Sequence, residues 1–403
     1  MTAPAREADL AIVGAGPAGC QLAIRAAAAG RSVLLLDPKA PWEKPCGGGI
    51  THKAWARAPI LADAALPRNE VFTSLQISPT GRFFVIDQGH ALLMVNRIEL
   101  ARVMLGRAEA AGARFLPLRV RKIESWGRSW RLVTDGGNFV ARFLVGADGA
   151  RSLVRRTFLG PLPRERMLAA LCQFYEGGPA DPSLIRVTPF PGYAWAFARP
   201  DRLAVGVGSM VHGRRLRPEL DRLLADFFPG RWPLSPSRGA LLPYMNGRAA
   251  YDEPRVGPGW ALVGDAAGFC DTLTGEGILY AVWSADLLAD ALAAGRPRDY
   301  DRAWRKAFGF HLATGAWMAS RLFSRKNIDR FFAALTVCPA FRAPFMDFVW
   351  NQPPYPVLTR RLLASLPRAL LQWRRFRKGG SVIDPSALGP FEKLADRLNL
   401  RWT

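Results

Sequence analysis

The feature that most constrains the fold is a short apolar run that breaks into three glycines, Gly14, Gly16 and Gly19, and continues into an alanine-rich stretch. This order predicts a strand, a tight turn and a helix. In such a unit the first glycine permits the turn, the second lets an anion approach the backbone, and the third lets the helix pack against the strand. The helix N-terminus, with Pro17 and Ala18 in its first turn, offers amide donors to that anion.

A second apolar run, residues 31–36, ends in the carboxylate of Asp37. Asp37 follows Gly16 by about 20 residues, the spacing at which an acidic residue holds a ribose hydroxyl in dinucleotide-binding βαβ units. The sequence therefore predicts a dinucleotide site in the first βαβ unit. An ordinary βαβ unit with no ligand is the alternative.

The chain of 403 residues carries 55 basic and 33 acidic side chains, a net charge of +22. A field of this sign favours nucleic acid, anionic lipid or a phosphorylated substrate, and an arginine-rich solvated surface is the alternative. No nucleic-acid-binding motif accompanies the charge, so we expect no nucleic-acid partner. The five cysteines are scattered without a CxxC pair and the sequence has no GxSxG elbow, which disfavours a disulfide framework, a metal site and a serine hydrolase.

The N-terminus lacks an apolar signal segment, and no later segment offers an apolar span long enough to cross a bilayer. We therefore expect a cytoplasmic protein, at most peripheral at the inner face of the membrane. The segment 356–378 resembles a basic interfacial helix, with a solvated surface helix as the alternative. Its leucine stripe and its basic residues are Leu358, Leu362, Leu366 and Leu370, and Arg360, Arg361, Arg368, Arg374, Arg375, Arg377 and Lys378.

Alternating apolar runs and turn residues predict an α/β fold: a Rossmann-like nucleotide-binding domain, an inserted antiparallel-sheet domain and a helical C-terminal region. The expected segments of the first domain are 1–70, 96–165 and 250–300, those of the second are 71–95 and 166–249, and the helical region is 301–403.

Several elements follow from pattern and punctuation. We expect a hairpin around residues 79–81, a helix over 96–111, and strands over 114–124, 130–134 and 139–146. One helix near 218–228 interrupts the strands of the second sheet, and another helix spans 278–294. The helical region is predicted to break at Pro339, Pro353, Pro354, Pro356 and Pro367.

Three predicted strands end at Gly14, Asp148 and Asp265, and ligands of parallel sheets bind outside the carboxyl ends of the strands. This order of motifs resembles the p-hydroxybenzoate-hydroxylase-like superfamily of flavoproteins, which binds FAD in an extended form. The resemblance implies that FAD is the cofactor, that Asp37 binds the adenosine ribose, that Arg97 approaches the pyrophosphate, and that Asp265 binds the ribityl chain. Asp148 belongs to the same cofactor-binding set.

Physical reasoning supports a second cofactor contact. The Gly275-x-Gly277 turn opens a predicted helix at Ile278, so amide donors and the positive end of the helix dipole would point at the pyrimidine edge of the flavin, where the reduced form is negative. A glycine turn that only starts a helix is the alternative.

Two stretches resemble the geranylgeranyl reductase family within this superfamily. Lys44-Pro-Cys46-Gly47-Gly48 is similar to its Lys-Pro-Cys-Gly-Gly signature. The core of its PxxYxWxFP motif is similar to Tyr193, Trp195 and Phe197, although Phe190 and Ala198 stand where the motif has proline. The resemblance places Lys44, Cys46, Gly47 and Gly48 beside the cofactor.

Tyr193, Trp195 and Phe197 alternate with alanine, so on a strand all three point to one face. Such a wall suits a polyprenyl chain, and core packing is the alternative. Cys46 lies in a glycine-rich loop beside the cationic Lys44 and is a candidate proton donor or positioning group; a buried structural thiol is the alternative. The predicted catalytic residues are Cys46, Tyr193 and Trp195, and the predicted substrate contacts are Tyr193, Trp195 and Phe197.

The resemblance implies an oxidoreductase that reduces carbon–carbon double bonds of an isoprenoid chain by hydride transfer from reduced flavin. The electron donor is open, with NAD(P)H and ferredoxin as candidates. A flavin-dependent monooxygenase or halogenase of the same fold is the main alternative, and a basic peripheral membrane protein with a structural FAD is the third.

Overall fold

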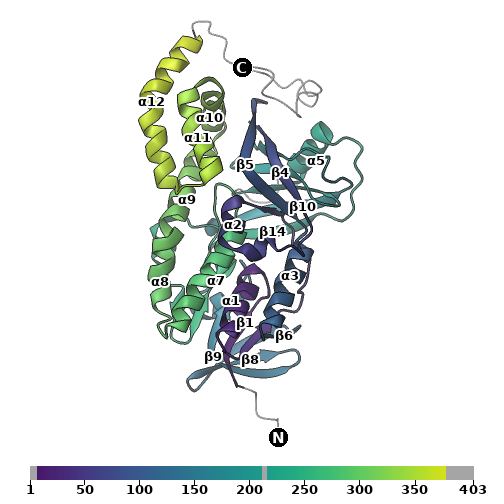
Figure 1. The fold of residues 1–403 in the computed structure, drawn as a ribbon, viewed down its shortest axis with the longest axis vertical. Helices are drawn as coiled ribbons and strands as arrows, with labels where there is room; N and C mark the ends of the chain where they lie inside the picture. Colours follow the sequence, from purple (N-terminus) through teal and green to yellow (C-terminus); the bar gives the residue numbers. More distant parts are fainter. Residues whose placement is uncertain (1–6, 211–215, 378–403) are drawn as a thin grey trace.

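The computed structural model describes residues 7–210 and 216–377, so Lys378 and the rest of the predicted helical region beyond it lie outside the described residues. Two sheets and a bundle of helices make up the described chain. In Figure 1 the sheet that contains β1 lies at the N-terminal end of the long axis, the second sheet lies beyond it, and helices α8 to α12 follow one side of both.

The first sheet is built around β1 (Glu7–Val13), which pairs in parallel with β2 (Val33–Leu36) on one side and β9 (Gly137–Gly146) on the other. The sheet has the order β15, β16, β9, β1, β2, β6, and a β7–β8 hairpin adds to β9. The bounds of its other strands are β6 Arg114–Leu116, β7 Val120–Trp126, β8 Ser129–Thr134, β15 Val256–Gly257 and β16 Trp260–Leu262. The strand predicted over 114–124 is therefore two strands.

Helices α1 (Pro17–Ala28), α3 (Arg97–Ala110) and α7 (Ile278–Ala293) pack together with this sheet, with α1 between the other two. The strands β1 and β2 are apolar along almost their whole length because helices or the β7–β8 hairpin cover both faces. The helices expected over 96–111 and 278–294 are confirmed as α3 and α7.

The second sheet has the order β14, β10, β13, β12, β11, β4, β5, β3 and is antiparallel except between β4 and β11. The hairpin predicted around residues 79–81 is confirmed as β4 and β5. The bounds are β3 Gly49–Ile50, β4 Arg68–Ile77, β5 Phe83–Val95, β10 Met167–Tyr175, β11 Leu184–Val187, β12 Gly192–Ala198, β13 Leu203–Ser209 and β14 Arg238–Pro243. Helix α5 (Leu216–Phe227) covers one face through an apolar cluster, and the other face lines a cavity.

The described C-terminal region is helical, as expected. Its helices are α8 Asp299–Trp304, α9 Phe310–Leu322, α10 Arg325–Val337, α11 Pro339–Asn351 and α12 Tyr355–Arg377, and a π-helical turn, Arg305–Gly309, joins α8 to α9. The short helices α2 His52–Arg57, α4 Leu153–Leu159 and α6 Gly247–Asp252 lie in connections. This architecture confirms the predicted α/β class.

Two of the predicted helix breaks are wrong, because α12 runs through Pro356 and Pro367. Pro356 is the second residue of the helix, where the missing N–H has no intrahelical partner to lose. Pro367 removes one interior hydrogen bond, and the exposed position of Leu363 lets water bind the carbonyl that is freed. Pro339 begins α11, and the break at residues 353–354 separates α11 from α12 as expected.

Within residues 7–210 and 216–377, no single helix is both long and apolar enough to span a bilayer. Helices α10 and α11 reach that length and hydropathy only when taken together, over residues Lys326–Val337 and Pro339–Asn351, and they are bent by 101° at the break between them.

Candidate active site

The glycine turn after β1 has the geometry that its spacing predicts. Gly14 has a φ of +104°, and a Cβ at Gly14 or Gly19 would overlap neighbouring backbone atoms. A Cβ at Gly16, in contrast, would meet nothing within 4 Å, and Gly16 lines a large cavity together with Pro17 and Ala18. Gly14 and Gly19 are thus required by the turn and the packing, whereas Gly16 leaves the N-terminus of α1 open to a ligand.

Two carboxylates stand near this turn. Asp37 accepts hydrogen bonds at Oδ2 from the Ala15 amide (3.0 Å) and at Oδ1 from two amides that follow it, so it fixes the loop after β2. Asp148 Oδ2 accepts from the Leu153 amide (2.6 Å), and burial raises the pKa of Asp148. Asp148 Oδ1 and Arg97 Nε are buried without a hydrogen-bond partner among the described residues, and both side chains line the cavity. Unpartnered polar atoms beside a cavity indicate a polar ligand.

The third strand end brings Asp265 to the same edge. Its Oδ2 atom pairs with Lys44 Nζ at 3.0 Å, which ties the cysteine loop to the loop after β16. Gly275 and Gly277 line the cavity directly before α7, which begins at Ile278. The amides of the first turn of α7 have no intrahelical acceptor, so this helix end presents donors to the cavity.

The cysteine loop differs from the sequence-based expectation in one respect. The cation beside Cys46 is not Lys44, which pairs with Asp265; the guanidinium groups of Arg97 and Arg199 flank Cys46 instead. Burial raises the pKa of the Cys46 thiol, but these two arginines and the Gly48 amide outweigh it, so the pKa lies below its ordinary value.

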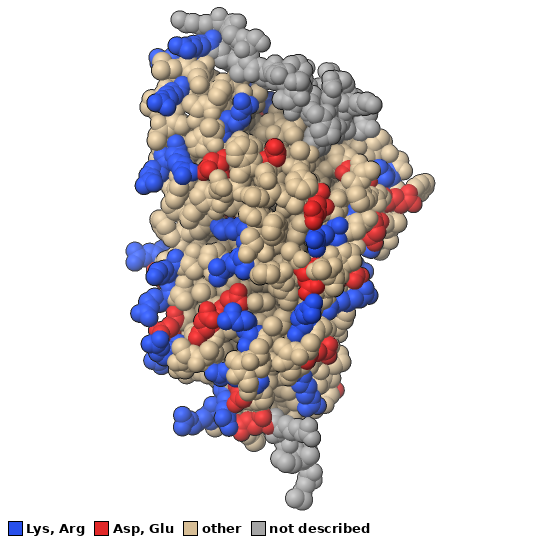
Figure 2. Space-filling model, in the orientation of Figure 1, with Lys and Arg blue, Asp and Glu red and all other residues tan. Residues whose placement is uncertain are grey.

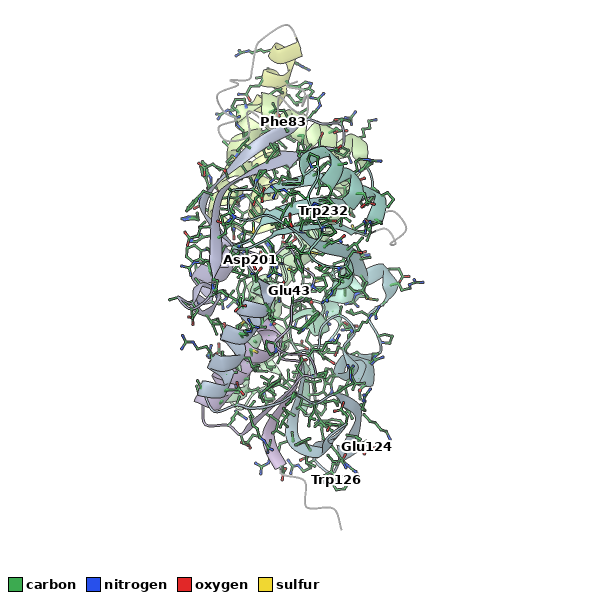
Figure 3. All side chains as sticks on the ribbon, turned by 90° about the vertical axis from the view of Figure 1, so that its right-hand side faces the viewer. Glu43, Phe83, Glu124, Trp126, Asp201 and Trp232 are labelled. Atoms are coloured by element: carbon green, nitrogen blue, oxygen red, sulfur yellow. The ribbon has the colours of Figure 1, made fainter. Side chains whose placement is uncertain are left out.

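Arg199 is a site residue that sequence reasoning missed. Its side chain is fully buried. Arg199 Nη1 pairs with Glu43 Oε1 at 2.6 Å, Nε donates to the Gly47 carbonyl at 3.1 Å, and Nη2 donates to the Cys46 carbonyl at 2.5 Å. Glu43 lies near the middle of the long axis in Figure 3, between the two sheets. The only signal for Arg199 in the sequence is a basic residue two positions after Phe197. The family motif has proline at the position between these two residues, where this chain has Ala198.

The aromatic residues of β12 lie on one face of the strand, as predicted, and line the cavity. The Tyr193 and Trp195 ring centroids are 6.0 Å apart. The Tyr193 hydroxyl donates to the Thr274 carbonyl at 2.5 Å and so contacts the loop before α7. A Cβ at Gly206 would overlap the Trp195 ring, and a Cβ at Gly47 would lie 2.6 Å from Phe197 Cδ2. The Trp195 ring therefore packs against Gly206, and the Phe197 ring packs against Gly47.

A second missed residue is Glu276, which lies between the two glycines before α7 and lines the cavity. Its Oε1 atom accepts a hydrogen bond from Thr51 Oγ1 at 2.5 Å. Burial raises the pKa of Glu276 to about 7, and the neighbouring charge of Asp271 adds to the increase. The signal in the sequence is the carboxylate inside the Gly275-x-Gly277 turn.

A buried polar network joins this loop to the helical region. Tyr355 donates from its hydroxyl to Asp271 Oδ2 at 2.9 Å, and His311 Nε2 lies 3.5 Å from the same oxygen. The His311 and Tyr355 rings stack with centroids 4.2 Å apart. The three residues come from a loop, α9 and α12, so the network holds two helices against the cofactor loop.

One continuous cavity of about 2130 Å³ is lined by the glycine turn after β1, the cysteine loop, the aromatic residues of β12, the loop before α7 and the buried polar network. Small-molecule sites usually occupy roughly 300–1000 Å³, so this cavity has room for a dinucleotide and a second ligand. Past the aromatic wall it continues between the second sheet and α9 to α12. The apolar residues in this extension include Phe84, Phe331, Phe332, Phe345, Phe348, Leu358 and Leu362.

The donor set fits FAD. The open glycine at the N-terminus of α1 suits a pyrophosphate, the unpartnered atoms of Arg97 and Asp148 suit its polar middle, and the helix end at Gly277 suits an electron-rich ring edge. Bound there, FAD would supply hydride chemistry to whatever occupies the apolar extension.

Comparisons with known proteins agree with this geometry. Residues 9–177 match the family model for lycopene cyclase protein. Over 359 residues the chain is 32% identical to menaquinone reductase from Mycolicibacterium smegmatis, covering 80% of this chain and 86% of that protein. It is also 32% identical to digeranylgeranylglycerophospholipid reductase 1 from Methanopyrus kandleri, covering 68% of this chain and 76% of that protein.

Solved structures share the fold. A geranylgeranyl bacteriochlorophyll reductase-like protein from Thermoplasma acidophilum superposes with a TM-score of 0.73 at 20% identity, over 96% of this chain and 99% of that one. A single-residue mutant of the halogenase PltM, solved with FAD, superposes with a TM-score of 0.63 at 13% identity, over 98% and 96%. The solved structures establish the fold, and the sequence relatives establish that the chain is an oxidoreductase and belongs to the geranylgeranyl reductase family.

Proposed function

We propose that this enzyme reduces carbon–carbon double bonds of an isoprenoid chain with reduced FAD. The observation that carries the proposal is the unbroken apolar cavity that runs from the cofactor motifs, past the aromatic wall, to the helices of the C-terminal region. A cavity of this length and lining suits a long hydrocarbon chain, because burial of each methylene contributes roughly 0.8 kcal/mol. The names of the relatives, which act on menaquinone and on geranylgeranyl lipids, support the same substrate class.

The cofactor contacts proposed from the sequence keep their roles. Gly16 and the first turn of α1 would hold the FAD pyrophosphate, Asp37 would bind the adenosine ribose, and Arg97 would approach the pyrophosphate. Asp265 binds the ribityl chain. The remaining members of the set are Gly14, Pro17, Ala18, Gly19, Lys44, Cys46, Gly47, Gly48, Asp148, Gly275, Gly277 and Ile278.

Cys46, Tyr193 and Trp195 position the substrate at the flavin. Tyr193 and Trp195 form the wall on which the alkene lies, with Phe197 beside them, and Trp195 Nε1 is buried without a hydrogen-bond partner among the described residues. Cys46 closes the site from the glycine-rich loop. We assign Cys46 a positioning role in the loop that the guanidinium groups of Arg97 and Arg199 flank.

The test is anaerobic. Holoenzyme with chemically reduced flavin is mixed with prenyl substrates, a geranylgeranyl lipid and a prenylated quinone, and the products are analysed by mass spectrometry. The expected product is heavier by two hydrogens for each reduced double bond, and enzyme with oxidised flavin is the control. No mass gain with any prenyl substrate refutes the proposal; oxygen consumption stimulated by an apolar or aromatic substrate would identify a monooxygenase or halogenase instead. Repeating the assay with NAD(P)H or reduced ferredoxin identifies the electron donor.

We further propose peripheral contact of α12 with an anionic membrane. Only part of the predicted leucine stripe is exposed to solvent. Leu358 is buried, whereas Leu366 and Leu370 are exposed. Their neighbours Leu363 and Leu371 are exposed as well. These four leucines, at 39% to 60% exposure, form an apolar strip on one helix. Figure 2 shows basic side chains gathered along the edge of the molecule that α12 and α8 form.

Sedimentation with vesicles tests this contact. We expect the protein to bind vesicles that contain anionic lipid and to bind neutral vesicles more weakly. Leu370→Glu combined with Leu371→Glu should abolish binding without loss of FAD, whereas Leu234→Glu, at an exposed leucine far from α12 in the chain, is the control. Equal binding of the double variant and the parent protein would refute the contact.

A further inference from the structure

Glu276 occupies a position from which it can reach a substrate. It lies in the turn before α7, and the neighbouring residue Thr274 accepts the hydrogen bond of the Tyr193 hydroxyl. Both Glu276 and Tyr193 line the cavity. The loop that carries Glu276 therefore contacts the aromatic wall through Tyr193, and the carboxyl lines the same cavity as that wall.

The hydrogen bond from Thr51 determines which oxygen of Glu276 can carry a proton. Thr51 is the N-cap of α2, and its Oγ1 accepts from the Ala54 amide at 3.3 Å, which leaves the hydroxyl proton for Glu276 Oε1 at 2.5 Å. No described residue donates a hydrogen bond to Glu276 Oε2. When the carboxyl is protonated, its proton is on Oε2 and is available to a ligand in the cavity.

We propose that Glu276 is the acid that protonates the substrate alkene and that Thr51 positions its carboxyl for this step. The inference rests on the proposed function. Reduced flavin is the hydride source for one alkene carbon. The electron pair of the π bond then takes the proton from Glu276 Oε2 at the other carbon. Two C–H bonds form as the π bond, the carboxyl O–H bond and the N–H bond of the hydride donor break, and the flavin, which is the reductant, would be left oxidised. The carboxylate left behind is reprotonated from solvent.

The surroundings of Glu276 raise its pKa to about 7, so its protonated form is present near neutral pH. Burial is the main cause of its raised pKa, and the negative charge of Asp271 adds to it, whereas Thr51 and Lys53 oppose it. Burial also lowers the pKa of Lys53, the cation among the neighbours of Glu276 that opposes the increase. The other titratable groups around the loop are Cys270, Tyr280 of α7, His311 of α9 and Tyr355 of α12.

Single-turnover reduction by Glu276→Gln holoenzyme is the first test. We expect the rate of product formation to fall by roughly 10²- to 10⁴-fold, the usual contribution of a general acid, with FAD content unchanged. The matched control is Glu109→Gln, an exposed position on α3. Activity of Glu276→Gln within threefold of the parent enzyme overturns the proposal.

Infrared spectroscopy of the holoenzyme without substrate gives a readout that is independent of turnover. The parent enzyme should show a buried carboxylic acid C=O band that titrates near pH 7 and is missing in Glu276→Gln. Absence of that band in the parent enzyme at pH 6 overturns the proposal, even if the variant is inactive. If the parent enzyme has the band but reduces no prenyl substrate, the proposed function fails while the state of Glu276 stands.

The pH profile tests the role of Thr51. The rate should decrease as the pH rises through the pKa of Glu276, because only the protonated carboxyl can act. Thr51→Val removes a hydrogen bond that stabilises the carboxylate, so the descending limb should move to higher pH, and Thr51→Ser should restore it. An unmoved limb in Thr51→Val contradicts the positioning role.

Discussion

Replacement of Arg199 by methionine tests whether the cysteine loop depends on the buried guanidinium. The change keeps most of the apolar stem over the Phe174 ring but removes the ion pair to Glu43 and the two hydrogen bonds to the loop carbonyls. Loss of one partner of a buried pair costs about 3–5 kcal/mol. Glu43 also caps α3 by accepting from the amides of Arg97 and Ile98, so we expect the lower end, about 3 kcal/mol or roughly 100-fold in the unfolding equilibrium.

Urea unfolding followed by tryptophan fluorescence measures the change, and the pH dependence of thiol alkylation measures the Cys46 pKa. That pKa should rise in Arg199→Met because one of the two flanking cations is lost. Arg202→Met is the control, since Arg202 also lies over Phe174 but forms a more exposed pair with Asp201, worth about 0–1 kcal/mol. A free energy of unfolding within about 0.5 kcal/mol of that of the parent protein would refute this account. An unchanged pH profile of thiol alkylation would refute it as well.

Three further outcomes can be measured directly. Gly206→Ala should displace the Trp195 ring and destabilise the protein by about 1–3 kcal/mol, with FAD retained, as monitored by thermal unfolding and flavin absorbance; an unchanged midpoint argues against tight packing there. Tyr193→Phe should cost about 1 kcal/mol in urea unfolding through loss of the hydrogen bond to the loop before α7, and Tyr193→Leu should cost more. Burial raises the pKa of Glu253, but Arg155 and two further arginines outweigh it and hold the pKa below 4.5. The stability that Glu253 contributes is therefore complete above pH 4.5 and lost as the pH falls through its folded-state pKa, and Glu253→Gln should flatten that part of the stability profile.

Much of the cofactor end was predictable because its signals are local. The turn at Gly14 follows from an apolar run and a backbone that needs a positive φ, and both lie within a few residues. Asp148 and Asp265 could be placed beside it because parallel strands bring their carboxyl ends to one edge. The face of Tyr193, Trp195 and Phe197 follows from strand alternation alone.

The rest depends on contacts between distant segments. Arg199 directly follows β12 in the chain and reaches the cysteine loop through tertiary contacts with the Cys46 and Gly47 carbonyls. Nothing in its local sequence distinguishes it from the many solvated arginines. The network of Asp271, His311 and Tyr355 joins a loop and two helices that have no common pattern. The charges that act on Cys46 are distant in the same way: Lys44, two residues along the chain, pairs with Asp265, whereas Arg97 and Arg199 come from distant segments.

The division of labour between Cys46 and Glu276 follows from their opposite surroundings in one cavity. Two buried guanidinium groups lower the pKa of Cys46, whereas burial and a neighbouring carboxylate raise that of Glu276 to about 7. Groups whose pKa values are moved in opposite directions take different roles, and we propose that the carboxyl of Glu276 is the acid. Thr51 lies on the chain just after the cysteine loop and binds Glu276, so the segment that positions the thiol also orients the carboxyl. Reduction of an unactivated double bond needs a hydride and a proton on two adjacent carbons. In the proposed reaction the carboxyl of Glu276 would therefore act at the carbon next to the one that receives the hydride from reduced FAD.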